Sequence, residues 1–188
     1  MTSSVETDEA RPNRMDARFG KVEVKIHSAL HEMLKMRRVD MQMGEFCQMA
    51  KISRPTLHAH CTKIDDALRQ YERNLEEKIT QRLLLVQDDE LIFLILLGMI
   101  GREQAYFAAT VPNHDYWLLN AIFEHLRERL TDEAVDNLDY DLYVHRQIAI
   151  ISCWVKFDAC ANERIPFYAT KLKEVKVTRY WAARYSSL

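Results

Sequence analysis

The residues with the clearest chemical pattern lie between Gly44 and Lys63, in the stretch GEFCQMAKISRPTLHAHCTK. Apolar side chains recur at helical spacing over 45–50 and 54–60, on either side of a break, which predicts two short helices joined by a tight turn. Ser53 can cap the second helix, and Pro55 fits its first turn, where a missing N–H costs nothing. Two such helices form a helix-turn-helix, whose second helix has the right size for the DNA major groove.

Six polar residues in and after this turn could contact DNA. Cationic and hydroxyl groups bind phosphates, and arginine pairs with guanine through two hydrogen bonds, so Arg54 is the candidate for contacting a base. His58 could donate to a phosphate, with a charge that varies near the reference pKa of about 6.5. The alternative is that all six are surface polar residues of a small helical domain. The predicted DNA-binding residues are Lys51, Ser53, Arg54, Thr56, His58 and Lys63.

The same stretch resembles the signature of the TetR family of bacterial transcriptional regulators. That family shows a pattern like vSrpTlYrhF, followed by a lysine, an acidic pair and a leucine, and here residues 53–57 and His60 match it. His58 stands where the family usually has tyrosine, Cys61 where it has phenylalanine, and Ile52 where glycine is common. The lysine also comes one residue early. The resemblance covers about residues 20 to 75 and depends on order and spacing rather than on one residue.

The resemblance implies an all-α protein, with an N-terminal three-helix helix-turn-helix domain and a C-terminal helical bundle for dimerisation and ligand binding. The composition agrees, because only 4 Gly and 4 Pro in 188 residues allow few turns and so favour long helices over many strands. We expect a polar, disordered arm over 1–19, the DNA-binding domain over 20–65, and the ligand-binding and dimerisation domain over 66–188.

Apolar spacing predicts where the helices lie. We expect a first helix over 22–36 and a long helix from a cap at Thr62, with Asp65 completing the cap, to about residue 85. By resemblance, this long helix transmits the ligand state to the DNA-binding domain. The apolar run over 91–100 is too short to span a bilayer and predicts a buried helix. Further helices are expected over 88–109, 114–130, 140–162 and 167–181, with a break at 111–113.

The second half of the chain is rich in large aromatic and methionine side chains. They could line a pocket for an apolar ligand of a few hundred Å3, although core packing explains them too and is favoured for each one singly. The candidate pocket residues are Phe93, Met99, Tyr106, Trp117, Phe123 and Trp154.

The helix expected over 140–162 is apolar on more than one face, which indicates a second surface to bury, most naturally against a partner chain. By resemblance, the last two long helices form the homodimer interface. The candidate interface residues are Ile148, Ile151, Val155, Tyr168 and Leu172.

Charge is divided unevenly along the chain. Residues 11–82 carry 15 Lys and Arg against 10 Asp and Glu, whereas residues 83–188 carry 11 against 15. This is expected if only the first part meets phosphates. The four cysteines form no CxxC pair and are predicted to be buried free thiols in a reducing cytoplasm. Neither a Gly-rich phosphate loop nor GxSxG, HExxH or zinc-spaced cysteines are present, so we expect no enzyme, cofactor or metal site.

The sequence therefore predicts a cytoplasmic, nucleoid-associated regulator, most simply a repressor. It would bind a palindromic operator in double-stranded DNA as a homodimer, without a membrane partner, and a small-molecule effector would lower its affinity. The alternative is a TetR-like scaffold with a degenerate helix-turn-helix that acts as a protein-interaction module. Its basis is the departures from the family pattern, above all Cys61, which is smaller than phenylalanine and could loosen the second helix.

Overall fold

The computed structural model describes residues 14–130 and 135–175, and within these ranges the chain is helical and contains no strand. The prediction of an all-α fold is confirmed. Residues 1–13, most of the expected arm, lie outside the described residues. The α-helices are α1 Arg14–Lys35, α2 Met43–Ala50, α3 Arg54–His58, α4 Ile64–Leu84, α5 Asp89–Arg102, α6 Gln104–Thr110, α7 Trp117–His125, α8 Arg127–Leu130, α9 Asn137–Phe157 and α10 Ile165–Glu174, with 3-10 helices η1 Val111–Asn113 and η2 Asn162–Arg164.

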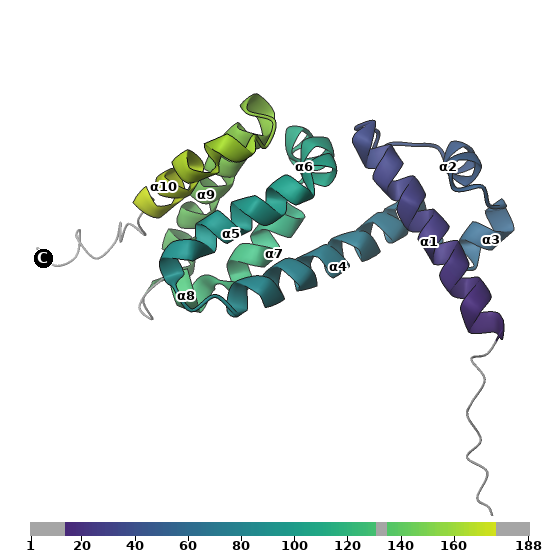
Figure 1. Ribbon diagram of the computed structural model, residues 1–188, viewed down its shortest axis with the longest axis horizontal. Helices are drawn as coiled ribbons and strands as arrows, with labels where there is room; N and C mark the ends of the chain where they lie inside the picture. The colour runs from purple at the N-terminus through teal and green to yellow at the C-terminus, as the bar shows by residue number, and fades with distance from the viewer. Residues whose placement is uncertain (1–13, 131–134, 176–188) are drawn as a thin grey trace, which may run out of the picture.

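The helices gather at two ends of the molecule, joined by α4 (Figure 1). At one end α1 packs against α2, and α2 against α3. At the other, α5 packs against α10, α7 lies along α4, and α9 contacts α6, α7 and α10. The two ends also meet directly, because α1 packs against α6.

The first helix is longer than expected. It begins at Arg14 rather than at Val22, so residues 14–19 are helical and the expectation of disorder for them is wrong. Two reasons are visible. The added turns contain Arg, Met and Ala, which are good helix formers, and they carry Phe19, whose ring stacks on His60 with centroids 3.8 Å apart. This tertiary contact holds the extra turns against the segment after α3.

The cap of α4 lies one residue later than expected. The backbone N–H of Lys63 donates to Asp66 Oδ2 at 2.8 Å, and α4 begins at Ile64, so the predicted cap at Thr62 with Asp65 is wrong. A carboxylate three residues after the capping position can accept this hydrogen bond, and the two adjacent aspartates allowed either register. The expected end of this helix near residue 85 agrees with its observed end at Leu84.

The expected helix over 88–109 is instead two helices, because the chain bends by 86° between α5 and α6. Side chains from α4 hold this bend: Tyr71 and Lys78 each donate to a carboxylate oxygen of Glu103 at 3.0 Å. Gly101 permits the close approach of the segment after α9, since a Cβ there would lie 3.3 Å from Asn162 Oδ1. The bend therefore depends on contacts between distant parts of the sequence.

The later helices are also shorter than expected. The predicted helix over 114–130 is divided into α7 and α8, and the one over 140–162 is α9, which ends at Phe157. Ala159 and Cys160 follow with φ of 48° and 58°, a left-handed conformation that no helix continues through. The last helix, expected over 167–181, is α10; residues beyond 175 lie outside the described part of the chain.

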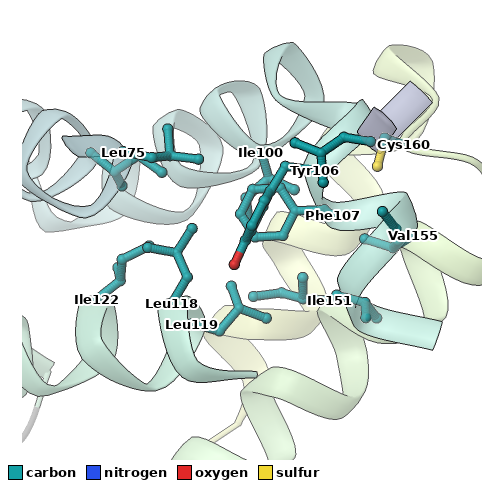
Figure 2. Close-up of a cluster of buried hydrophobic side chains, with 14 of the residues drawn as sticks. Leu75, Ile100, Tyr106, Phe107, Leu118, Leu119, Ile122, Ile151, Val155 and Cys160 are labelled. Carbon is teal, nitrogen blue, oxygen red and sulfur yellow. The ribbon is translucent and has the colours of Figure 1, made fainter. Parts of the chain in front are cut away.

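The core of the larger end is packed by side chains from α4, α5, α6, α7 and α9. Figure 2 shows Tyr106 and Phe107 of α6 among the aliphatic side chains of its neighbours, with the labelled set Leu75, Ile100, Leu118, Leu119, Ile122, Ile151, Val155 and Cys160. The fully buried Trp154 of α9 belongs to the same core and donates from Nε1 to the carbonyl of Ala161 at 3.2 Å. These contacts fix α9 and the loop after it against the bend between α5 and α6.

Among the described residues, none of the helices is by itself both long and apolar enough to cross a membrane. The pair α5 and α6 passes that test jointly, by length and composition only, and is the pair that bends by 86°.

We expect the free energy of unfolding to fall as the pH rises from about 8.5 to about 11. Burial raises the pKa of the Cys160 thiol to about 11, and raises the pKa of Tyr143 and Tyr168 to about 12. The native chain therefore holds these protons more tightly than the unfolded chain, so the stabilisation is complete below the unfolded pKa of each group and is lost above it. Urea unfolding at several pH values tests this; a constant or rising free energy of unfolding over that range would contradict it.

Gly98→Ala is expected to raise the free energy of unfolding by about 0.5–1 kcal/mol. Gly98 lies inside α5, and a Cβ there would have no atom within 4 Å, so alanine gains helix propensity without a clash. Gly101→Ala is the matched control, because its Cβ would lie 3.3 Å from Asn162 Oδ1 and 3.6 Å from Trp154. Urea unfolding compares the two variants, and an equal gain from both would show that local space does not decide the effect.

Candidate nucleic-acid interface

The turn between α2 and α3 has the geometry that its residues predict. Lys51 has φ of 53°, a left-handed conformation that reverses the chain, and the N–H of Ile52 donates to Cys47 O at 3.1 Å. Ser53 Oγ then accepts from the N–H of Thr56 at 3.2 Å, so the predicted cap is confirmed. Pro55 lies in the first turn of α3. The left-handed position is occupied by lysine, so a residue other than glycine carries the small cost of that conformation.

One side of this pair of helices is buried. Leu57 of α3 and Phe46 of α2 are both fully buried, and with Ala50 they belong to the core that includes Leu30 and Met33 of α1. Because the apolar residues face inward, the polar residues of α3 and of the turn remain on the outer surface. The burial of Leu57 was predicted by its spacing.

Five of the six predicted DNA-binding residues are exposed, and the sixth, Thr56, is half-buried. The Thr56 hydroxyl lies 2.7 Å from the Ser53 hydroxyl, so both groups help to begin α3 rather than projecting freely. The Arg54 guanidinium lies across α2, since a Cβ on Gly44 would be 2.8 Å from its Nη2. The five exposed residues are Lys51, Ser53, Arg54, His58 and Lys63.

Three cations on this surface keep their charge uncompensated. Lys51, Arg54 and Lys63 make no ion pair with any side chain in the described ranges. The nearby carboxylate of Glu45 is occupied by Arg38, which donates to it with both terminal nitrogens, the second at 3.0 Å. The surface of the turn and α3 is therefore locally positive, although the whole chain has a net charge of -2.

The residues after α3 have structural roles. His60 stacks on Phe19, and Cys61 is half-buried, where burial raises the pKa of its thiol and keeps it neutral. His58, by contrast, is exposed. Within the described ranges, no group of three His, Cys, Asp or Glu side chains is arranged to hold a metal ion. All four cysteines are free thiols, although Cys153 is exposed rather than buried as predicted.

A buried polar network connects α4 to the larger end of the molecule. The Glu72 carboxylate is fully buried, accepts from Tyr106 Oη of α6 at 2.8 Å, and accepts from Arg69 Nη1 at 2.7 Å. Arg69 in turn lies 3.7 Å from Asp115 Oδ2 and over the ring of Trp117. The sequence gives no periodic signal for this network, because a single glutamate on an amphipathic helix looks like a surface residue.

The predicted ligand-pocket residues do not gather around one cavity. Phe93, Tyr106, Phe123 and Trp154 are side chains of the packed core, with at most 5% of their surface exposed. Met99 faces a groove on the other side of α5, and Trp117 is 39% exposed beside Arg69. Core packing, the alternative explanation, accounts for the first four. A groove between α4 and α5 is present that the sequence did not indicate.

The predicted dimer-interface residues are buried inside the chain itself. Ile148, Ile151, Val155, Tyr168 and Leu172 have at most 8% of their surface exposed, so they are not available to a partner. The prediction was wrong because both apolar faces of α9 are covered internally, by α6, η1 and α7 and by α10. The exposed apolar residues on α9 and α10 are Leu138, Leu142, Phe157 and Phe167.

Comparison with known proteins adds no family to this description. No family model matches the chain, and neither the curated proteins nor the solved structures contain a match.

Proposed function

We propose that this protein is a DNA-binding transcriptional regulator that binds a palindromic operator as a homodimer and responds to a small-molecule effector. The observation that carries the proposal is the capped turn between α2 and α3. It buries Leu57 and leaves Lys51, Arg54 and Lys63 exposed and without a carboxylate partner in the described part of the chain. A short helix with free cations at its start and just beyond its end is the arrangement that meets phosphates and base edges in a major groove.

The packing of α2 and α3 on the rest of the molecule supports the proposal. Helix α3 packs on α2, α2 packs on α1, and α1 packs on α6, while α4 is joined to α6 by the hydrogen bond between Glu72 and Tyr106. A ligand that moves α5 or α6 would therefore act on both α1 and α4. In a dimer this would change the spacing of the two recognition helices. The affinity for DNA would then fall, because the half-sites of an operator lie at a fixed separation of about 34–36 Å.

Homodimerisation would use the exposed apolar residues of α9 and α10 rather than the buried ones. Phe157 is 80% exposed and Leu142 is 40% exposed, so replacing both by aspartate should leave the fold intact. Light scattering after gel filtration is expected to show a dimer for the wild type and a monomer for this variant. Val24→Asp is the control, since Val24 of α1 is 69% exposed at the other end. A wild-type monomer would contradict this part of the proposal.

A salt titration of DNA binding tests the proposed function. Specific binding should persist in excess random duplex, and the logarithm of the affinity should fall linearly with the logarithm of the salt concentration. A dimer that binds no DNA at low salt would overturn the regulator and favour the alternative, a protein-interaction module with a degenerate helix-turn-helix.

A further inference from the structure

A groove of about 800 Å3 lies between α4 and α5, on the opposite side of α5 from the packed core. Its two walls differ in chemistry. The α5 wall is apolar and includes Leu94, Ile95, Gly98 and Met99, and Leu85, just beyond α4, extends it at one end. The α4 wall is polar, with the amides Asn74 and Gln81 and the charged residues Glu77, Lys78 and Arg82; Arg102 at the end of α5 completes the rim.

The groove is open above Gly98, in the middle of α5. A Cβ built on Gly98 would have no atom within 4 Å, so the groove reaches the backbone of α5 at this point. Gly98 has no positive φ and makes no turn, and glycine inside a helix lowers stability by about 1 kcal/mol relative to alanine. The space above Gly98 is therefore free for an occupant. Leu94 and Met99 are only partly buried beside it.

The charges around the groove are unbalanced. Lys78 is paired with Glu103 at 3.0 Å, and Glu77 accepts from Gln81 at 3.0 Å. Arg82 and Arg102 are both exposed and have no carboxylate partner among the described side chains. Arg82 lies one turn after Lys78 on α4, and Arg102 comes from the facing helix, so the rim offers two free guanidinium groups above an apolar wall.

We propose that this groove binds an amphipathic anion with a single alkyl chain, a fatty-acid carboxylate. The alkyl chain would lie along Leu94, Ile95 and Met99 and over Gly98, where apolar contact replaces water. The carboxylate would be held by Arg82 and Arg102, because a guanidinium can donate two parallel hydrogen bonds to a carboxylate. The volume is within the range of 300–1,000 Å3 that is usual for small-molecule sites.

The position of the groove gives such a ligand a route to the other end of the molecule. It lies on α4, which contacts α1, and its rim includes Lys78, which holds the bend through Glu103. A carboxylate between Arg82 and Arg102 would tie α4 to the end of α5. Its role as the effector of DNA binding depends on the proposed function above, whereas the binding itself does not.

Calorimetric titration of the full chain with dodecanoate, in the absence of DNA, tests the site. We expect one dodecanoate to bind per chain. Octanoate, which is shorter by four methylene groups, should bind with an affinity at least about tenfold lower. Dodecyltrimethylammonium, which has the opposite charge, should not bind. Arg82→Gln and Arg102→Gln should each lower the affinity about fivefold, as removal of a partly exposed ion pair does. Equal binding of the cationic amphiphile would overturn the proposal.

A variant that fills the groove provides the sharpest comparison. Gly98→Leu introduces a better helix former into open space, so α5 should remain folded, as circular dichroism can verify, while dodecanoate binding is lost. Gly20→Leu is the matched control, because a Cβ on Gly20 of α1 also has no atom within 4 Å. Retained binding in Gly98→Leu, or no binding to the wild type, would overturn the site. If Gly98→Leu instead changed the oligomeric state, the groove would belong to a second copy of the chain.

Discussion

Replacing Lys51, Arg54 and Lys63 together by alanine is expected to lower the affinity for operator DNA at least about a hundredfold, and to reduce the slope of log affinity against log salt by about 3. Each side chain is exposed and has no carboxylate partner in the described ranges, so its charge is available to a phosphate or a base. Each cation that no longer neutralises a phosphate removes the release of about one counterion, which is what sets the salt slope. Losing the base contact of Arg54 costs about 1–3 kcal/mol of binding free energy in addition. Fluorescence anisotropy with labelled duplex at several salt concentrations measures both quantities.

A second triple variant controls for net charge. Arg82, Arg102 and Lys156 are also exposed cations, but they lie on α4, α5 and α9, away from the turn between α2 and α3. Their replacement by alanine removes the same three charges. When the binding is measured without fatty acid, so that the groove between α4 and α5 is not engaged, long-range attraction falls equally while the proposed contacts remain. Equal losses of DNA affinity in the two variants would show that binding depends only on the net charge of the protein, and would contradict the proposed interface.

Trp154→Ala is expected to lower the free energy of unfolding by about 3–5 kcal/mol, the largest effect of any single substitution considered. Trp154 is fully buried, donates to the Ala161 carbonyl at 3.2 Å, and packs beside Tyr168 with ring centroids 6.2 Å apart. Its removal leaves a cavity between α9 and the end of α5, and the Ala161 carbonyl keeps only the backbone N–H of Arg164, at 3.1 Å, of its two donors. Small domains have about 5–15 kcal/mol of stability in total, so urea unfolding should show a large shift of the midpoint.

Trp117→Ala is the matched control for this prediction. Trp117 is 39% exposed and its described interaction is with the Arg69 guanidinium, 5.8 Å from the ring centroid. A surface contact of this kind contributes about 0.5–1 kcal/mol. If the two tryptophan variants lost the same free energy of unfolding, the division between core and surface described for this end of the molecule would be wrong.

The parts of the fold that sequence predicted are those set by local interactions. Ser53 caps α3 by a hydrogen bond to a residue three positions away, Pro55 prefers a first turn, and Leu57 follows the spacing of an apolar face. The all-α class follows from similar local preferences. None of these features requires knowledge of which distant residues become neighbours, so a single sequence suffices to predict them.

The features that sequence did not predict depend on contacts between distant residues. The bend at Glu103 is held by Tyr71 and Lys78 from α4, and the early start of α1 accompanies the stacking of Phe19 on His60. A continuous apolar pattern through 88–109 contains no sign of those partners. The shift of the α4 cap from Thr62 to Lys63 has a local cause instead, because the two adjacent aspartates made both cap positions plausible from the sequence.

Apolar faces were the least informative signal about function. The two apolar faces of α9 indicated a partner chain, but α6, η1, α7 and α10 of the same chain cover them. The aromatic side chains expected around a ligand likewise fill the core. Conversely, the groove along α5 has a mixed lining from two helices, with a glycine at its centre, and only the folded arrangement brings these residues together.

The measurement that tests the central claim most directly is selection of bound sequences from random duplex DNA by the purified protein, with Arg54→Ala in parallel. The wild type is expected to enrich a palindrome, and the variant should fail to recover it or should lose preference at one base pair in each half-site, because Arg54 is the candidate base-contacting residue of α3. Such a result would identify the operator and place α3 in the major groove. No enrichment by folded, dimeric protein, with and without dodecanoate, would contradict the claim that this chain is a sequence-specific DNA-binding regulator.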